Sequence, residues 1–218
     1  MSEIFIKAAL GYLLGSIVGS LLVGRLRGGV DIREQGSGNA GGTNALRTQG
    51  KAFAFWVLLI DIGKGWLATG LLAAARIPGI GTAPVPWRVW SVAACGIAVM
   101  LGHVYPLWHG FRGGKGVATL VGAVLGASPL LLVPMLAVWL LAVVLFGFVG
   151  LASILGALAF AVAAAASSAG PRIPLLTFAV LSAVLIAFTH RGNIARMVAG
   201  TEPRARRLWL LGAARQRS

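Results

Sequence analysis

The chain alternates long apolar stretches with short polar ones. Seven apolar stretches have about the length that a helix needs to cross a bilayer, which is roughly 20 residues. They are residues 4–26, 53–75, 88–105, 117–131, 132–147, 151–168 and 175–189. The region from 117 to 170 is divided only by Pro129, Pro134 and two glycines within residues 146–153, so its boundaries are the least defined. The pattern predicts an all-α integral membrane protein with about seven transmembrane helices in one polytopic domain, residues 1–218.

Composition supports this class. Hydrophobic residues make up 58% of the 218 residues and charged residues 11%, whereas a soluble domain carries about 25% charged residues. The single cysteine, Cys95, lies in an apolar stretch, so no disulfide framework is expected. Cys, His, Asp and Glu form no cluster in the sequence, which predicts neither a protein-bound metal nor another cofactor.

Charge predicts the orientation of the chain. The formal net charge is +14, which in a soluble protein would suggest a nucleic-acid partner. Here the basic residues gather in three polar segments and in an Arg-rich tail from Arg204 to Arg217. By the positive-inside rule these parts lie in the cytoplasm, where they attract anionic lipid or a phosphorylated substrate. We therefore expect the N-terminus outside, the C-terminus in the cytoplasm, and no nucleic-acid partner.

The first polar segment, residues 25–51, contains a glycine-rich run from Gly36 to Arg47. Glycines adopt positive φ easily, so successive backbone N–H groups can point into one concavity. Small polar side chains and an arginine fork would complete a phosphate cradle; the candidates are Ser37, Gly38, Asn39, Thr43, Asn44 and Arg47. A flexible surface linker is the alternative interpretation. The run matches neither the Walker pattern nor a dinucleotide site, which argues against a nucleotide enzyme.

Two further polar segments, residues 102–119 and 190–202, fall on the same predicted face. The second places Gly113 and Gly114 before Lys115, as a phosphate contact requires. In the third, His190 is a candidate base near neutral pH, and Asn193 shares its helix face if the helix continues there. A structural histidine at a helix end is the alternative. We expect Arg47, Lys115 and either Arg191 or Arg196 to surround one or two phosphates.

Two features lie within the predicted spans. Gly11, Gly15 and Gly19 repeat every four residues, which predicts close helix packing in lipid. Asp61 and Lys64 are three residues apart, and ionisable groups at that depth are usually functional. A self-neutralising pair is an equally good interpretation. No serine–histidine–acid triad is evident, so the chemistry is expected to use an already activated substrate that cations hold and neutralise.

Taken together, these motifs resemble the bacterial glycerol-3-phosphate acyltransferases that use acyl-phosphate, the PlsY family. The first block of resemblance comprises Gly15-Ser16-Ile17, Asp31-Ile32-Arg33 and the run from Gly36 to Arg47. The second comprises Gly102-His103, Pro106, Phe111, Gly113-Gly114-Lys115 and Val117-Ala118-Thr119. The third comprises His190-Arg191, Asn193-Ile194, Arg196 and Gly200-Thr201-Glu202. The chain departs from the family pattern at Val18, where proline is usual, and at Gly42, where alanine is usual.

The resemblance implies acyl transfer from acyl-phosphate to the 1-hydroxyl of glycerol 3-phosphate, without acyl-CoA or metal, at the cytoplasmic face of the bacterial inner membrane. Ser37, Thr43, Asn44 and Arg47 would cradle phosphate. Lys115, with Gly113 and Gly114, would bind a second phosphate or the developing oxyanion. His190 and Asn193 would orient the hydroxyl, and Ser153 would add a contact, whereas Glu202 would pin the C-terminal segment. The proton acceptor is either His190 or a substrate phosphate.

A transporter or flippase for a phosphorylated solute or lipid is the competing class, because Asp61 and Lys64 would suit one. Transporters usually bind near the bilayer midplane between related halves. The polar segments here lie at one predicted face and the two halves of the chain differ, which favours the enzyme.

Overall fold

The computed structural model describes residues 2–168, 170–205 and 208–209. These residues form helices and loops, with no strand among them. Within the described part of the chain, five helices are long and apolar enough to cross a membrane, or six if the bent pair at the N-terminus counts as one span. The chain divides into two compact units, Met1–Pro129 and Leu130–Ser218. Arg206, Arg207, Arg215 and Arg217 of the predicted basic tail lie outside the described residues.

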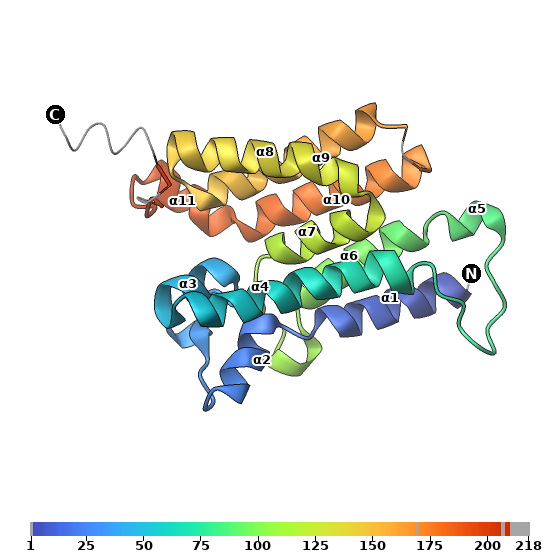
Figure 1. Ribbon diagram of the computed structural model, residues 1–218, viewed down its shortest axis with the longest axis horizontal. Coiled ribbons are helices and arrows are strands. Elements are labelled where there is room, and N and C mark those ends of the chain that lie inside the picture. The colour runs from blue at the N-terminus through green and yellow to red at the C-terminus, as the bar shows by residue number, and fades with distance from the viewer. Residues whose placement is uncertain (1, 169, 206–207, 210–218) are drawn as a thin grey trace. The chain divides into compact units, whose positions relative to one another are not determined.

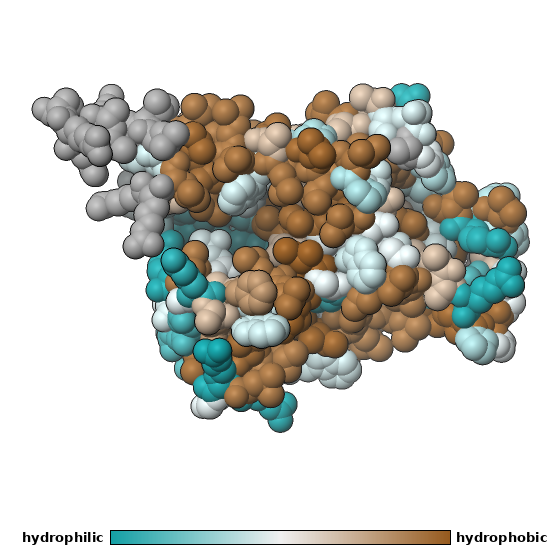
Figure 2. All heavy atoms as spheres, in the orientation of Figure 1, coloured by the Kyte–Doolittle hydropathy of each residue, from teal (hydrophilic) through white to brown (hydrophobic). Residues whose placement is uncertain are grey.

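The first unit contains four helices that lie side by side, α1, α4, α6 and α7 (Figure 1). Figure 2 shows hydrophobic side chains along these helices and hydrophilic ones near α2 and α3 at one end and near α5 at the other. In chain order the elements are α1 (Ser2–Gly15), α2 (Gly19–Leu26), η1 (Ile32–Glu34), α3 (Gly42–Gln49), α4 (Lys51–Trp66), the π-helix η2 (Leu67–Leu72), α5 (Val85–Arg88), α6 (Ser91–Val104), η3 (Leu107–His109) and α7 (Val117–Ala127).

The second unit is built on long apolar helices. They are α8 (Pro129–Phe146), α9 (Val149–Ala166) and α10 (Arg172–Thr189), followed by the short α11 (Arg191–Val198). The predicted turn between α8 and α9 is confirmed, and it uses Gly147 at φ +76°. Helices α9 and α10 pack together, with the rings of Phe160 and Phe178 edge to face at 5.5 Å.

The first predicted span is not one continuous helix, because it breaks after Gly15 and resumes at Gly19 with a bend of 45°. Lys64 Nζ donates to the carbonyls of Gly15 and Ile17 at 3.0 and 2.8 Å, at the C-terminal end of α1. Asp61 Oδ1 accepts from the N–H of Gly19 at 3.0 Å, where α2 begins. A cation at a carbonyl end and a carboxylate at an N–H end complement the two helix dipoles. The two carbonyls and the Gly19 N–H at the break therefore have partners within the apolar interior.

The boundaries in the long apolar region also differ from the prediction. The break lies at Ser128, between α7 and α8, and not near residue 131. Pro129 is the first residue of α8, a position that suits proline because that N–H has no partner in the helix. Pro134 does not break the chain and lies inside α8. Helix α7 has 11 residues and is therefore roughly 16 Å long at 1.5 Å per residue.

The close packing predicted from the glycine repeat is confirmed. A Cβ atom on Gly15 would overlap the carbonyl of Val99 in α6, and one on Gly11 would lie 3.3 Å from the carbonyl of Cys95. Gly102 of α6 makes the reciprocal approach, because its Cβ would overlap the carbonyl of Tyr12. Small residues let helix backbones approach this closely, which maximises packing in lipid.

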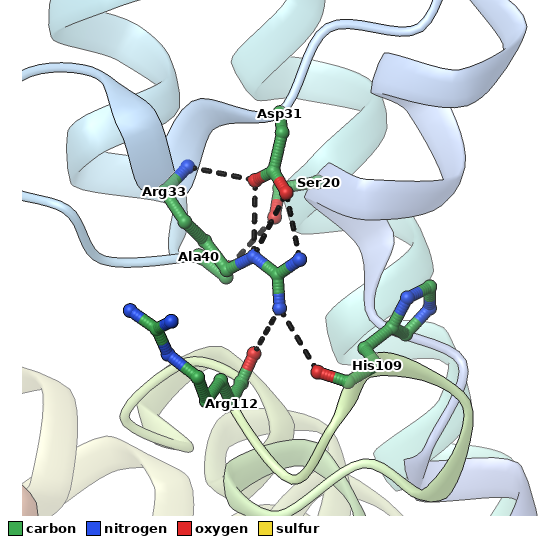
Figure 3. Close-up of polar contacts among 6 residues, drawn as sticks. All are labelled: Ser20, Asp31, Arg33, Ala40, His109 and Arg112. Atoms are coloured by element: carbon green, nitrogen blue, oxygen red, sulfur yellow. Dashed lines mark hydrogen bonds and ion pairs between the residues drawn. The ribbon is translucent and has the colours of Figure 1, made fainter.

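Arg33 ties the first polar segment to the second (Figure 3). Asp31 Oδ1 accepts from the backbone N–H and Nε of Arg33 at 2.9 and 3.0 Å, and Oδ2 pairs with Nη2 at 2.6 Å. With its guanidinium fixed in this way, Arg33 donates through Nη1 to the carbonyls of His109 and Arg112, at 3.0 and 2.8 Å. The hydrogen bonds that Asp31 accepts from Arg33 hold the pKa of Asp31 below its usual value of 3.8.

Replacing Gly15 by alanine should destabilise the protein by about 1–3 kcal/mol, the usual cost of overpacking a close contact. The expected result is a lower thermal midpoint in detergent, by roughly 2–4 °C for each kcal/mol. Gly63→Ala in α4 is the matched control, because no described atom lies within 4 Å of a Cβ built there. It should leave the midpoint unchanged or raise it through helix propensity. Equal midpoints for the two variants would contradict the packing argument.

The Asp31–Arg33 pair should lose its stabilising effect only in acid. Because folding lowers the pKa of Asp31, its contribution is complete above the unfolded value, near 3.8, and is lost as the pH falls through the folded value. Asp31→Asn should therefore lower the thermal midpoint by the same small amount at pH 7 and pH 5, with a shrinking difference below about pH 4. Thermal unfolding of both proteins across this range tests it; a difference that vanishes at pH 6 would contradict it.

Candidate active site

The glycine-rich run of the first polar segment folds around Asn44. The Asn44 side chain is buried and donates through Nδ2 to the carbonyls of Ile32 and Gln35, at 2.9 and 3.0 Å. Its Oδ1 accepts from the backbone N–H of Ser37 at 3.0 Å. Gly36 has φ +59° and leaves no room for a Cβ, which would overlap Asn44 Oδ1. Asn44, predicted as a phosphate ligand, thus uses its amide within the loop and contributes by shaping it.

The other candidates of this run lie at the surface of the first unit. Ser37, Gly38, Thr43 and Arg47 are exposed, and Asn39 is partly buried. Thr43 and Arg47 both belong to α3 and are four residues apart, so they share a face of that helix. Thr43 also lies in the first turn, where backbone N–H groups without helical partners favour an anion. This surface suits a phosphate.

In the second polar segment the chain folds back along the end of α6. The N–H of Gly113 donates to the Val104 carbonyl at 3.0 Å, and that of Gly114 donates to the His103 carbonyl at 3.1 Å. A Cβ on Gly113 would overlap the His103 carbonyl, and one on Gly114 would overlap the His103 ring. Only glycines permit this approach, which places the half-buried Lys115 two residues before the start of α7. The loop reverses through Gly110, Phe111 and Gly116, all at positive φ.

The first two polar segments meet, as predicted. Besides the two bonds from Arg33, a Cβ on Gly114 would lie 3.2 Å from the Ala40 carbonyl. Ser20 Oγ donates to that same carbonyl at 2.9 Å (Figure 3). The phosphate candidates of both segments therefore belong to one end of the first unit.

The third polar segment lies in the second unit, where His190 forms the junction of α10 and α11. The imidazole is buried, and Nδ1 lies 2.8 Å from the Ile186 carbonyl. A carbonyl only accepts, so Nδ1 carries the proton and Nε2 is the accepting nitrogen of the neutral ring. This tautomer is the one that a base acting through Nε2 requires.

Asn193 lies one turn further on in α11, and it too is buried. Its Nδ2 donates to Glu202 Oε1 at 2.5 Å, while Arg196 Nε pairs with Glu202 Oε2 at 2.6 Å. Glu202 thus pins the segment after α11 to that helix, as predicted. A Cβ on Gly150 would lie 2.9 Å from the Asn193 side chain, which brings the start of α9 against α11.

Ser153 lies one turn after Gly150 and so on the same side of α9. Its side chain is buried, and Oγ donates to the Val149 carbonyl at 2.8 Å. The meeting of His190 and Asn193 with Arg47 and Lys115 stays a prediction.

Two connections were missed by sequence reasoning. Arg33 was included as a basic residue and as part of the Asp31-Ile32-Arg33 motif, and its ion pair with Asp31 was not predicted, although their spacing permits it. His103 was named only as part of the Gly102-His103 motif, but its Nδ1 lies 2.8 Å from Lys64 Nζ and 3.4 Å from Asp61 Oδ1. His103 is 39 positions from Lys64 in the chain, so local spacing gave no sign of this contact. Within the described ranges, no group of three or more His, Cys, Asp or Glu residues could hold a metal ion.

Comparison with known proteins gives one consistent family. The family model described as glycerol-3-phosphate acyltransferase matches residues 5–200. A glycerol-3-phosphate acyltransferase of Synechococcus sp. strain JA-2-3B'a(2-13) is 43% identical over 199 residues, which are 91% of this chain and 93% of the relative. One of Bacillus cereus strain G9842 is 40% identical over 205 residues, with 94% and 96% of the two chains covered.

Solved structures match the fold. The crystal structure of PlsY (YgiH), an integral membrane glycerol 3-phosphate acyltransferase, in its glycerol 3-phosphate form is 33% identical, with a TM-score of 0.81 over 94% of this chain and 96% of that one. Its lysophosphatidic acid form is 32% identical, with a TM-score of 0.79 over 94% and 95% of the two chains. The family match favours the enzyme over the transporter alternative. The chain therefore belongs to the glycerol-3-phosphate acyltransferase family and is an integral membrane enzyme.

Proposed function

We propose that this enzyme transfers an acyl group from acyl-phosphate to the 1-hydroxyl of glycerol 3-phosphate, which is the first acylation of phospholipid synthesis. The observation that carries this proposal is the pair of similar crystal structures, one in the glycerol 3-phosphate form and one in the lysophosphatidic acid form. These ligands differ by a single acyl group, so they correspond to the acceptor and the product of one transfer. The donor follows from the resemblance of the motifs to the acyl-phosphate-dependent family.

The first polar segment supplies one phosphate site. Ser37 is exposed on the loop, Thr43 in the first turn of α3, and Arg47 in its last turn on the same helix face as Thr43. Their hydroxyls and guanidinium, with the N–H groups at the start of α3, can share one phosphate. Gly38 and Asn39 contribute backbone and amide donors, and Asn44 holds the loop in shape through its three hydrogen bonds.

The second polar segment supplies a second cation. Lys115 follows Gly113 and Gly114, whose backbone is fixed against the end of α6. Its ammonium group is suited to the donor phosphate or to the oxyanion that develops on the acyl carbon. Two cationic sites at one end of the first unit agree with two phosphorylated substrates, and neither acyl-CoA nor a metal or other cofactor is required.

His190, Asn193 and Ser153 act on the acceptor hydroxyl. In the transfer, the 1-hydroxyl oxygen forms a bond to the acyl carbon, and the bond from that carbon to the donor phosphate oxygen breaks, which releases inorganic phosphate. His190 Nε2 receives the hydroxyl proton, because Nδ1 is held by the Ile186 carbonyl. A substrate phosphate oxygen is the competing acceptor, since a phosphate monoester has its second pKa near 6. Asn193, held by Glu202, orients the hydroxyl.

The proposed setting is the bacterial inner membrane, with one catalytic domain over the whole chain and the phosphate sites at the cytoplasmic face. Seven membrane segments, with α1 and α2 as one and the short α7 as another, put the N-terminus outside and the C-terminus in the cytoplasm. The supporting observation is the charge pattern, because Arg25, Arg27 and the basic residues of the three polar segments would then lie inside.

Purified enzyme in detergent should convert acyl-phosphate and glycerol 3-phosphate into lysophosphatidic acid and inorganic phosphate in equal amounts. Phosphate release and product formation, measured in parallel, test this balance. Palmitoyl-CoA in place of palmitoyl-phosphate should give no lysophosphatidic acid, because the second cationic site recognises a phosphate next to the reacting carbon. Turnover of palmitoyl-CoA at the same rate would contradict the proposed donor.

His190→Gln should lower kcat by roughly 100-fold or more at saturating substrates, which is the lower end of the usual effect of a general base. Steady-state kinetics, with thermal unfolding as a check of folding, measures this change. Val198→Ala is the neighbouring control, since Val198 is an apolar residue of α11 that is 86% exposed and belongs to none of the polar motifs, and it should keep kcat close to the wild-type value. A raised KM with wild-type kcat in His190→Gln would instead make the substrate phosphate the proton acceptor.

A further inference from the structure

We propose that Asp61, Lys64 and His103 form a positioning network that holds both phosphate-binding segments of the first unit in place. The inference rests on the role proposed above for Lys115, and it adds three residues that act through the loops and do not touch the substrate. All three side chains are at most 3% exposed. Asp61 and Lys64 belong to α4, and His103 lies near the end of α6.

The network is centred on Lys64. Its Nζ lies 2.9 Å from Asp61 Oδ1 and 2.8 Å from His103 Nδ1, besides its bonds to two carbonyls of the α1–α2 break. A protonated lysine has only donors, so the 2.8 Å contact makes His103 Nδ1 the acceptor and puts the ring proton on Nε2. The buried cation therefore has a carboxylate and several acceptors around it, which the cost of burying a charge requires.

One route leads from the network to the Lys115 loop through His103. The edge of the ring that carries Nε2 lies against Gly114, where any Cβ would overlap it. The His103 carbonyl accepts from the Gly114 N–H at 3.1 Å. Both the ring and the backbone of His103 therefore set the position of the residue next to Lys115.

A second route runs through the break between α1 and α2, which Asp61 and Lys64 hold at Gly15, Ile17 and Gly19. Two serines at this point make long-range hydrogen bonds, Ser16 within the break and Ser20 at the start of α2. Ser16 Oγ accepts from the N–H of Leu107, in the second polar segment, at 3.2 Å. Ser20 Oγ donates to the Ala40 carbonyl, in the first polar segment, at 2.9 Å.

These routes explain why charged groups are kept inside the helix bundle. A pair of apolar side chains would pack at least as stably as a buried ion pair, but it would not satisfy the open backbone groups of the break. Rigid support of this kind preserves the geometry of binding groups, since small misplacements reduce catalysis strongly. The chemical role of the network is thus to position the Lys115 loop and the Ala40 region relative to each other.

A double-mutant cycle between His103 and Lys115 tests the inference. His103→Asn keeps an acceptor near Nδ1 for Lys64 but removes the ring edge that touches Gly114. It should lower kcat/KM for glycerol 3-phosphate about 10-fold in the wild-type background, and by less than about 2-fold when Lys115→Met is already present. The readout is the loss of additivity, measured on purified full-length enzyme with saturating palmitoyl-phosphate.

The control is another buried ion pair of the first unit, Glu3–Lys7, with 2.9 Å between Glu3 Oε1 and Lys7 Nζ. Any effect of Glu3→Gln on kcat/KM should be the same in both backgrounds, because a general loss of stability does not act through Lys115. If His103→Asn does not fold, Gly114→Ala replaces it, since the added methyl pushes the loop away from the ring. It should show the same loss of additivity with Lys115→Met.

The outcomes separate the two proposals. Equal fold-reductions by His103→Asn with and without Lys115→Met would overturn the positioning network, while the role of Lys115 would stand. Unchanged kcat/KM in Lys115→Met alone would overturn the role proposed for Lys115, and with it the basis of this inference. A large effect of His103→Asn that disappears beside Lys115→Met supports both.

Discussion

A buried charge needs partners, and Lys64 in the first unit is such a charge. Its ammonium group lies in an apolar helix bundle, and its neighbours there are Asp61, His103 and two backbone carbonyls. Without these acceptors the free-energy cost of burying the charge would exceed the stabilisation gained from packing. The break between α1 and α2 depends on the same interaction, because Lys64 and Asp61 replace the backbone partners that a continuous helix would have supplied.

Glycines make this arrangement possible. The backbones of α1 and α6 approach so closely at Gly15 and Gly102 that each carbonyl of the partner helix occupies the place of a Cβ atom. Gly65 of α4 and Gly122 of α7 make the same kind of contact. The helices are thus close enough for short hydrogen bonds to cross between them, and polar groups within the bundle can be satisfied by neighbours rather than by water.

Contacts with these helices and between the loops fix the geometry of the polar loops. Arg33 reaches the carbonyls of His109 and Arg112 because Asp31 fixes its guanidinium, and Gly114 fits between the His103 ring and the Ala40 carbonyl. In the second unit, His190 and Asn193 are held in the same manner, by the Ile186 carbonyl and by Glu202. In the first unit the shape of the short loops is thus imposed by contacts from distant parts of the chain, whereas in the second unit the partners of His190 and Asn193 are near in the chain.

Hydropathy alone determined the membrane class, most of the helix positions and the three polar segments, because length and apolar character are local properties. The residue types of the segments indicated a phosphate substrate before any geometry was known. Only tertiary structure decided that the first span breaks at Ser16–Val18, that Asn44 shapes a loop with its amide, and that His103 belongs with Asp61 and Lys64. The break and the His103 contact depend on residues 39 or more positions apart in the chain, and the Asn44 amide bonds backbone groups that are 7 to 12 positions away. No local pattern of apolar and polar positions encodes these contacts.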